Sequence, residues 1–189
     1  MTKLGAVASV QMGYPFRSRL EHDPKGDVVV IQMKDIDDAD LLHPESAVKV
    51  SLPMAKGHHL LREGDLAFRS RGRTNSAALV AAPIQHAVLA APMLLIRPQG
   101  VLPAYLRWFI NLPRTQAMLS AQSEGTSVRM VSKDAIAALD IPLPSAASQR
   151  RIVEIASLAQ VERALMAQIA EQKRRLVDGA LARYARNAR

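Results

Sequence analysis

The spacing of apolar residues changes near Pro144, and this change divides the chain into two parts. After Pro144, apolar residues return every three or four positions or at sums of these steps, which is the repeat of one face of an α-helix. No proline follows, and Ser145 stands where it can cap the first turn. The pattern predicts a globular domain over residues 1–144 and one long helix within residues 145–189.

The predicted helix is too long to bury its apolar face within so small a chain. About 40 residues form a rod roughly 60 Å long. The apolar stripe is thin, with Glu162 and Gln172 close to it and Gly179 weakening the last turns, which suits a coiled coil better than a deep core. We expect a second copy of the chain to cover it, and packing back on its own domain is the alternative. The expected contact residues are Ile155, Leu158, Leu165, Ile169, Leu176 and Ala180.

Before Pro144, short apolar runs rich in β-branched residues alternate with Gly and Pro, a pattern that predicts short strands. Strands are expected at residues 27–33, 66–69, 77–82, 87–90 and 93–97, and helices at 104–111, 114–121 and 132–139. Tyr105, Trp108 and Phe109 have helical spacing and are expected in the core. The expected fold class is α+β: a mixed, strand-rich domain followed by one long C-terminal helix that pairs as a coiled coil.

Charge adds a candidate partner to this picture. The chain carries a net charge of +8, with 25 Lys and Arg against 17 Asp and Glu, and its isoelectric point is about 10.3. Both predicted parts are basic, which is typical of proteins that bind a phosphate backbone. There is no Cys, which excludes disulfides, thiolate zinc sites and cysteine nucleophiles. No apolar run is long enough to cross a membrane, so we expect a soluble, cytoplasmic protein.

Two basic stretches are candidates for contact with double-stranded DNA. In the loop expected at residues 11–19, Tyr14 and Phe16 alternate with two arginines, a combination that stacks on bases and attracts phosphates, although Phe16 fits the core equally well. Farther on, Arg69, Arg71 and Arg73 stand at alternate positions, so their side chains share one face of an extended chain. Three such arginines repel one another unless an anion is near. The candidate DNA-binding residues are Tyr14, Arg17, Arg19, Lys34, Arg69, Arg71, Arg73, Thr74, Asn75, Ser127, Arg129 and Lys133.

The sequence offers little support for catalysis or for a metal. Phosphate-cradling glycine loops, the zinc-protease His motif and the nucleophile elbow are all absent. The acidic run at residues 34–40 is interpreted as solvated charge rather than a calcium loop, and the pair His58–His59 has no carboxylate at ligand spacing. We expect no enzyme activity, no metal and no cofactor.

Several short motifs, in order, resemble the target-recognition domain of type I restriction–modification specificity subunits. They are Leu4-Gly5, the stretches at residues 13–18 and 31–36, the segment 61–71 around Gly64-Asp65, Gly125-Thr126-Ser127, and Ile141-Pro142-Leu143-Pro144 followed by residues 149–153. The resemblance implies a non-enzymatic DNA reader that holds a DNA methylation subunit and, through it, a restriction and translocation subunit.

Members of that family have two recognition domains and two helical spacers, whereas this chain has one of each. It therefore resembles a half-length form, which would act as a homodimer and read a bipartite, inverted-repeat site. The alternative is a basic, non-catalytic adaptor that docks a partner through its long helix without reading bases. A nuclease or methyltransferase is a third and weaker interpretation.

Overall fold

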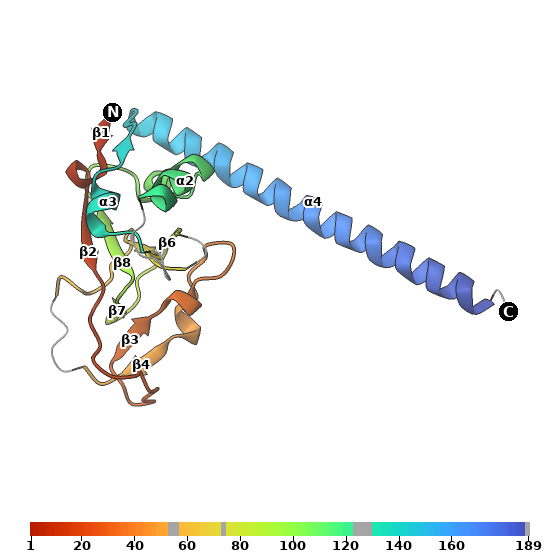
Figure 1. The fold of residues 1–189 in the computed structure, drawn as a ribbon, viewed down its shortest axis with the longest axis horizontal. Coiled ribbons are helices and arrows are strands. Elements are labelled where there is room, and N and C mark those ends of the chain that lie inside the picture. Colours follow the sequence, from red (N-terminus) through yellow and green to blue (C-terminus); the bar gives the residue numbers. More distant parts are fainter. Residues whose placement is uncertain (53–56, 73–74, 123–129, 188–189) are drawn as a thin grey trace. The chain divides into compact units, whose positions relative to one another are not determined.

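A computed structural model describes residues 1–52, 57–72, 75–122 and 130–187. The chain divides into two compact units, Met1–Gln149 and Arg150–Arg189. The first unit is a mixed α+β domain and the second consists of one helix (Figure 1). The α+β class with a long C-terminal helix is therefore confirmed.

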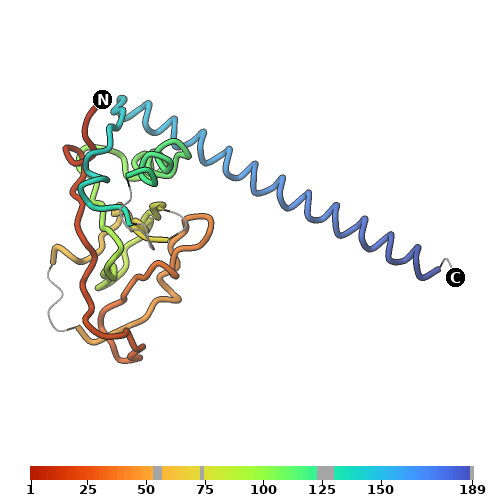
Figure 2. Tube along the Cα trace, in the orientation of Figure 1, coloured from red at the N-terminus to blue at the C-terminus, as the bar shows by residue number. Residues whose placement is uncertain are grey.

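Two sheets form the centre of the first unit. The larger has the order β2 (Ala8–Met12), β8 (Leu94–Pro98), β5 (Leu66–Phe68) and β6 (Ala77–Leu79), and every pairing in it is antiparallel. The smaller has the order β4 (Val48–Val50), β3 (Val28–Ile31) and β7 (Ala87–Leu89), with β3 parallel to β7 and antiparallel to β4. A short pairing of β1 (Thr2–Lys3) with β9 (Asp140–Ile141) places the first residues beside the segment that leads into the long helix (Figure 2).

Strand β3 is apolar throughout because both of its faces are covered. Ile31 belongs to the main core, which also contains Ala67, Ala78 and Leu95 of the larger sheet, and Val29 is partly buried against it. Side chains alternate along a strand, so Val28 and Val30 point the other way, into a second cluster with Tyr14 and Phe16 packed against it. The loop that follows β2 thus covers the outer face of the smaller sheet.

Three helices of the first unit lie close to where the sequence predicted them: α1 (Pro103–Ile110), α2 (Pro113–Ala121) and α3 (Lys133–Ala137). The hydroxyl of Ser132 caps α3 by accepting a hydrogen bond from Ala135 N at 3.1 Å. Short 3-10 helices lie at Leu4–Ala6 (η1), Met33–Asp35 (η2) and Pro44–Ser46 (η3). The core prediction for α1 was partly wrong: Tyr105 is buried, but Trp108 and Phe109 stay partly exposed, and Leu106 and Ile110 complete the buried face.

Helix α4 (Ala146–Asn187) is one uninterrupted helix of 42 residues. Ser145 caps it, since its hydroxyl accepts a hydrogen bond from Ser148 N at 3.3 Å. The first turn belongs to the globular unit because Gln149 is buried there, where its Oε1 accepts from Leu102 N and its Nε2 donates to Pro144 O. Farther along, the large apolar side chains from Ile155 to Tyr184 are 53–76% exposed.

Candidate nucleic-acid interface

The globular unit contains a surface cleft of about 630 Å³, which we call the basic cleft. Four segments line it: the loop after β2, the start of η2, the first residue of β4, and the turn between β7 and β8. Its lining residues are Phe16, Ser18, Arg19, Leu20, Gln32, Met33, Lys34, Val48, Ala90, Ala91, Pro92 and Met93. The cleft therefore combines apolar side chains with two cations and two neutral polar groups.

Gly13 holds two of these segments together. Its N–H donates to Met93 O at 2.8 Å, and the next N–H, of Tyr14, donates to Leu89 O at 2.6 Å. A Cβ at position 13 would lie 2.7 Å from Leu89 O, so only glycine lets the two backbones approach this closely. The rings of Tyr14 and Phe16 then pack at a centroid distance of 4.9 Å, which gives the loop a fixed base.

The basic cleft brings together two of the predicted DNA-binding residues, Arg19 and Lys34. Both are exposed, and neither forms an ion pair with a residue in the described part of the chain. Arg17 is also exposed on the same loop, although it does not line the cleft. Tyr14 is half-buried beneath the loop. These cations are positioned where a phosphate backbone could meet them without first breaking an internal contact.

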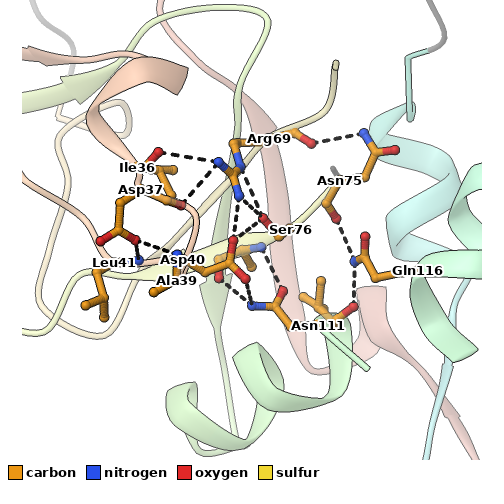
Figure 3. A network of polar contacts seen from close by, with 12 residues as sticks. Ile36, Asp37, Ala39, Asp40, Leu41, Arg69, Asn75, Ser76, Asn111 and Gln116 are labelled. Carbon is orange, nitrogen blue, oxygen red and sulfur yellow. Dashed lines mark hydrogen bonds and ion pairs between the residues drawn. The ribbon is translucent and has the colours of Figure 1, made fainter. Parts of the chain in front are cut away.

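Arg69 is different, because it is part of an internal polar network (Figure 3). Its Nη2 lies 2.6 Å from Asp40 Oδ1, and the two side chains are only 12% and 22% exposed. Arg69 also donates to Ser76 Oγ, and Ser76 in turn donates to Asp40. The same carboxylate accepts from Asn111 Nδ2 at 3.1 Å. For Arg69 the premise that no acid balances its charge was therefore wrong: the balancing acid is Asp40, 29 residues earlier in the chain.

This network also corrects the interpretation of the acidic run at residues 34–40 as solvated. Asp35 is 2% exposed, and Asp40 faces Arg69, whereas Asp38 is exposed as expected. Among the described residues, no group of three or more His, Asp or Glu side chains is arranged to hold a metal ion. The carboxylates here stabilise loops and an ion pair.

The remaining predicted DNA-binding residues are scattered. The Asn75 amide is turned inward, with Nδ2 donating to Arg69 O at 3.1 Å. Arg71 is exposed and forms a β-bridge with Met130, and Lys133 is exposed at the first position of α3. Arg73, Thr74, Ser127 and Arg129 lie outside the described residues. The structure thus gathers only part of the predicted set into one place.

One titratable cluster lies next to the Arg69 network. His43 bonds to Asp37 Oδ2 and to Glu45 Oε1, each at 3.0 Å. The hydrogen bond to Asp37, and then that to Glu45, raises the pKa of His43 above its usual 6.5. The same bond to His43 is the main cause of the lowered pKa of Asp37. A second pair lies deeper, where Asp65 holds Arg97 at 2.7 Å and raises the pKa of that guanidinium.

Sequence reasoning missed the polar lining of the cleft, Ser18 and Gln32 in particular. Gln32 carries a weak signal: it stands three residues before Asp35, the spacing of a capping box. In a capping box, each of the two side chains accepts a hydrogen bond from the backbone N–H of the other residue. Gln and Asp are not the usual residues of that motif. No comparable signal marks the turn between β7 and β8, because its position depends on contacts far apart in sequence.

No protein-family model matches the chain, and no curated protein matches it. Solved structures do. The chain is similar to the HsdS subunit from Thermoanaerobacter tengcongensis, with a TM-score of 0.61 and 21% identity over 87% of this chain and 37% of that one. It is also similar to a chain from a structural study of complex assembly and conformational transition in the type I R-M system. The TM-score is 0.64, and the identity is 21% over 87% of this chain and 38% of that one.

A third similar structure is the type I restriction–modification S subunit from M. genitalium, with a TM-score of 0.54 and 14% identity over 94% of this chain and 43% of that one. The present chain thus spans less than half the length of each of these proteins. Identities this low establish likeness of fold. The chain has the α+β fold, with a long C-terminal helix, of the type I restriction–modification specificity subunits.

Proposed function

We propose that this chain is the sequence-specific DNA-binding subunit of a type I restriction–modification system. The observation that carries the proposal is the basic cleft, in which Arg19 and Lys34 stand exposed on a fold shared with specificity subunits. Guanidinium and ammonium groups hold phosphates and set the register of a protein on the duplex, while polar groups in the groove read base edges. The other candidate cations that are exposed in the described part of the chain, Arg17, Arg71 and Lys133, extend the phosphate contacts.

The role is one of binding rather than catalysis. The described lining of the basic cleft contains no carboxylate and no imidazole, the groups that most often transfer protons in enzymes. In this proposal the chemistry on DNA belongs to the methylation subunit that the chain holds and to the restriction and translocation subunit recruited through it. A structural neighbour from a type I R-M complex supports this partnership.

Helix α4 supplies the surfaces for the two protein partners. At 100° per residue, its exposed apolar side chains cover an arc of roughly 200°. The stripe of Ile155, Leu158, Leu165, Ile169, Leu176 and Ala180 is the proposed contact with a second copy. Met166, Val177 and Leu181 are also exposed, beside this stripe. A two-stranded coiled coil covers a narrower stripe than the whole arc, so we assign these flanking positions to the methylation subunit.

Selection of bound sequences from a random duplex library tests the proposal. The purified chain, alone and with its methylation subunit, is expected to enrich a bipartite inverted repeat. The variants Arg19→Ala and Lys34→Ala should each flatten the dependence of log affinity on log salt by about one, with the selected bases unchanged. Arg62→Ala is the matched control, because Arg62 is exposed but does not line the cleft.

The alternative function, a basic adaptor that docks through α4, makes the opposite prediction. An adaptor would bind its partner at full strength while enriching no sequence, and its affinity for DNA would not depend on Arg19 or Lys34 beyond the loss of charge seen in the Arg62→Ala control. That combination of results would replace the proposed function with the adaptor.

A further inference from the structure

Gln32 is a cleft residue whose side chain is already oriented by the fold. It occupies the N-cap of η2, where its side chain accepts a hydrogen bond from the backbone N–H of Asp35. In return, the Asp35 carboxylate accepts from Gln32 N at 2.7 Å. Asp35 is 2% exposed, so this reciprocal pair is anchored in the protein interior.

The pairing determines which end of the Gln32 amide is available. A carboxamide has one oxygen that accepts hydrogen bonds and one NH₂ group that only donates them. The Asp35 N–H donates to the Gln32 backbone oxygen at 3.0 Å and also to the Gln32 side chain, and only the oxygen of that amide can accept it. The NH₂ group is then the end left over, and no residue in the described parts of the chain accepts a hydrogen bond from it. Gln32 therefore presents a free NH₂ donor, while its oxygen is already engaged by the Asp35 N–H and keeps one lone pair.

This restriction changes what a glutamine can read in the major groove. Gln usually recognises adenine by donating to N7 and accepting from the N6 amino group. In Gln32 the oxygen is already engaged by the Asp35 N–H, so only the NH₂ end of the amide is wholly available to a base. Guanine, in contrast, presents two neighbouring acceptors, N7 and O6. An oriented NH₂ group can donate to both acceptors of that edge. At adenine it could donate only to N7 and would face the N6 amino donor, and at cytosine it would face the N4 amino donor.

We propose that Gln32 is a specificity-determining residue that reads a guanine in each half-site, with Arg19 and Lys34 holding the neighbouring phosphates. The inference rests on the proposed function, since it requires DNA in the basic cleft. It adds to that function the identity of one reading residue and of the base that it selects.

The test is the variant Gln32→Glu. A carboxylate oxygen can still accept from Asp35 N–H, so the capping box remains, while the second oxygen replaces the NH₂ donor with an acceptor of the same size. We expect one position of each selected half-site to change from guanine to cytosine or adenine. Affinity for the wild-type site should fall by about 5- to 150-fold, the usual range for one bidentate contact. The other selected positions should not change.

Gln85→Glu is the matched control for charge, because Gln85 is exposed and does not line the cleft, so the same substitution adds the same negative charge outside it. It should affect affinity for all sequences alike and leave every selected base as it is. If Gln32→Glu behaves like Gln85→Glu, the inference is overturned while the proposed function stands. If the wild-type chain enriches no sequence, both fail.

Modified duplexes give a second measurement that uses only the wild-type chain and is therefore independent of the folding of any variant. Each selected guanine is replaced in turn by 7-deazaguanine, which lacks the N7 acceptor. One guanine per half-site should show a loss of affinity of at least about 5-fold. Unchanged affinity at every guanine would overturn the inference.

Discussion

Whether an arginine is free to meet DNA depends on which acid the fold places beside it. Arg19 and Arg69 look alike in the sequence, each in a short basic stretch after a strand. The fold places Asp40 against Arg69 and leaves Arg19 exposed at the basic cleft. An arginine held by a nearly buried carboxylate cannot turn to a phosphate without leaving that carboxylate unpaired. We therefore expect Arg69 to contribute to stability, and we propose Arg19, not Arg69, for contact with DNA.

The first prediction follows from this difference. Asp40→Ala leaves the Arg69 guanidinium without its carboxylate, and Ser76 and Asn111 lose an acceptor as well. We expect the free energy of unfolding to fall by about 2–3 kcal/mol, below the range for fully buried pairs because these side chains keep some exposure. Urea denaturation measures it, and Asp38→Ala, on an exposed neighbour, is the control. A loss no larger than that of the control would contradict the assignment.

The second prediction concerns the pH dependence of stability. The pKa of His43 is raised in the folded chain. The stability that protonated His43 contributes is therefore fully present below its unfolded pKa near 6.5 and is lost as pH rises through its folded pKa. The urea midpoint of the wild type should be higher than that of His43→Gln, and the difference between the two midpoints should be larger at pH 5.5 than at pH 8.5. Asp37 stays ionised at both, since its pKa is lowered below 3.8.

Asp37→Asn provides the control for that comparison. It removes the carboxylate that contributes most to the raised pKa of His43 but keeps an oxygen for the backbone N–H groups of Ala39 and Leu41. When His43→Gln is added to the Asp37→Asn variant, the resulting change in urea midpoint should depend less on pH than it does in the wild type. An equal dependence in both backgrounds would show that Asp37 does not set the titration of His43.

At the level of elements, the sequence predicted which segments are helices and strands better than how they pair. The apolar run that became β3 was predictable because β-branched residues fill it. Its parallel pairing with β7, nearly sixty residues later, was not, since nothing local specifies a distant partner. The same reason explains β2, which extends to Met12, two residues into the predicted loop, because Gln11 and Met12 pair with β8.

The candidate site shows the same limit. Alternating aromatic and basic residues marked the loop at Tyr14–Arg19, and Lys34 was also among the candidates. That Arg19 and Lys34 share one cleft depends on the close backbone approach at Gly13 and on the turn at Ala90–Met93. The role of Asp40 was hidden for the same reason, because 29 residues separate it from Arg69. Local patterns identify residue types, and only the fold shows which of them meet.

The third prediction tests the apolar stripe of α4. Leu165 and Ile169 are 53% and 55% exposed, and a homodimer would bury them. Leu165→Asp and Ile169→Asp should each convert the dimer to a monomer, because a carboxylate in a dry helix seam is not paired. Light scattering at micromolar concentration gives the mass. Gln160→Asp is the control, since residue 160 lies off the stripe. A monomeric wild type would contradict the proposed dimer.

At the scale of the whole molecule, the proposed homodimer gives the length of α4 a role in DNA recognition. Its 42 residues make a rod of about 63 Å at 1.5 Å per residue. In an antiparallel pair, each globular unit is joined to the first turn of its own helix, so the two recognition surfaces belong to opposite ends of the pair. The helix length would then determine how many unread base pairs separate the half-sites, and two-fold symmetry would make those half-sites inverted copies.

The last prediction follows from that geometry. Seven residues of helical sequence inserted between Ile169 and Leu176 keep the apolar stripe in register and lengthen the rod by about 10 Å. Since DNA rises roughly 34 Å per turn of 10 base pairs, the preferred spacer should grow by about three base pairs while the selected bases stay the same. Seven Gly and Ser residues at the same point are the control, because a flexible insert should broaden the preferred spacer instead of shifting it. A folded dimer with the helical insert and an unchanged spacer would show that α4 does not set the distance between half-sites.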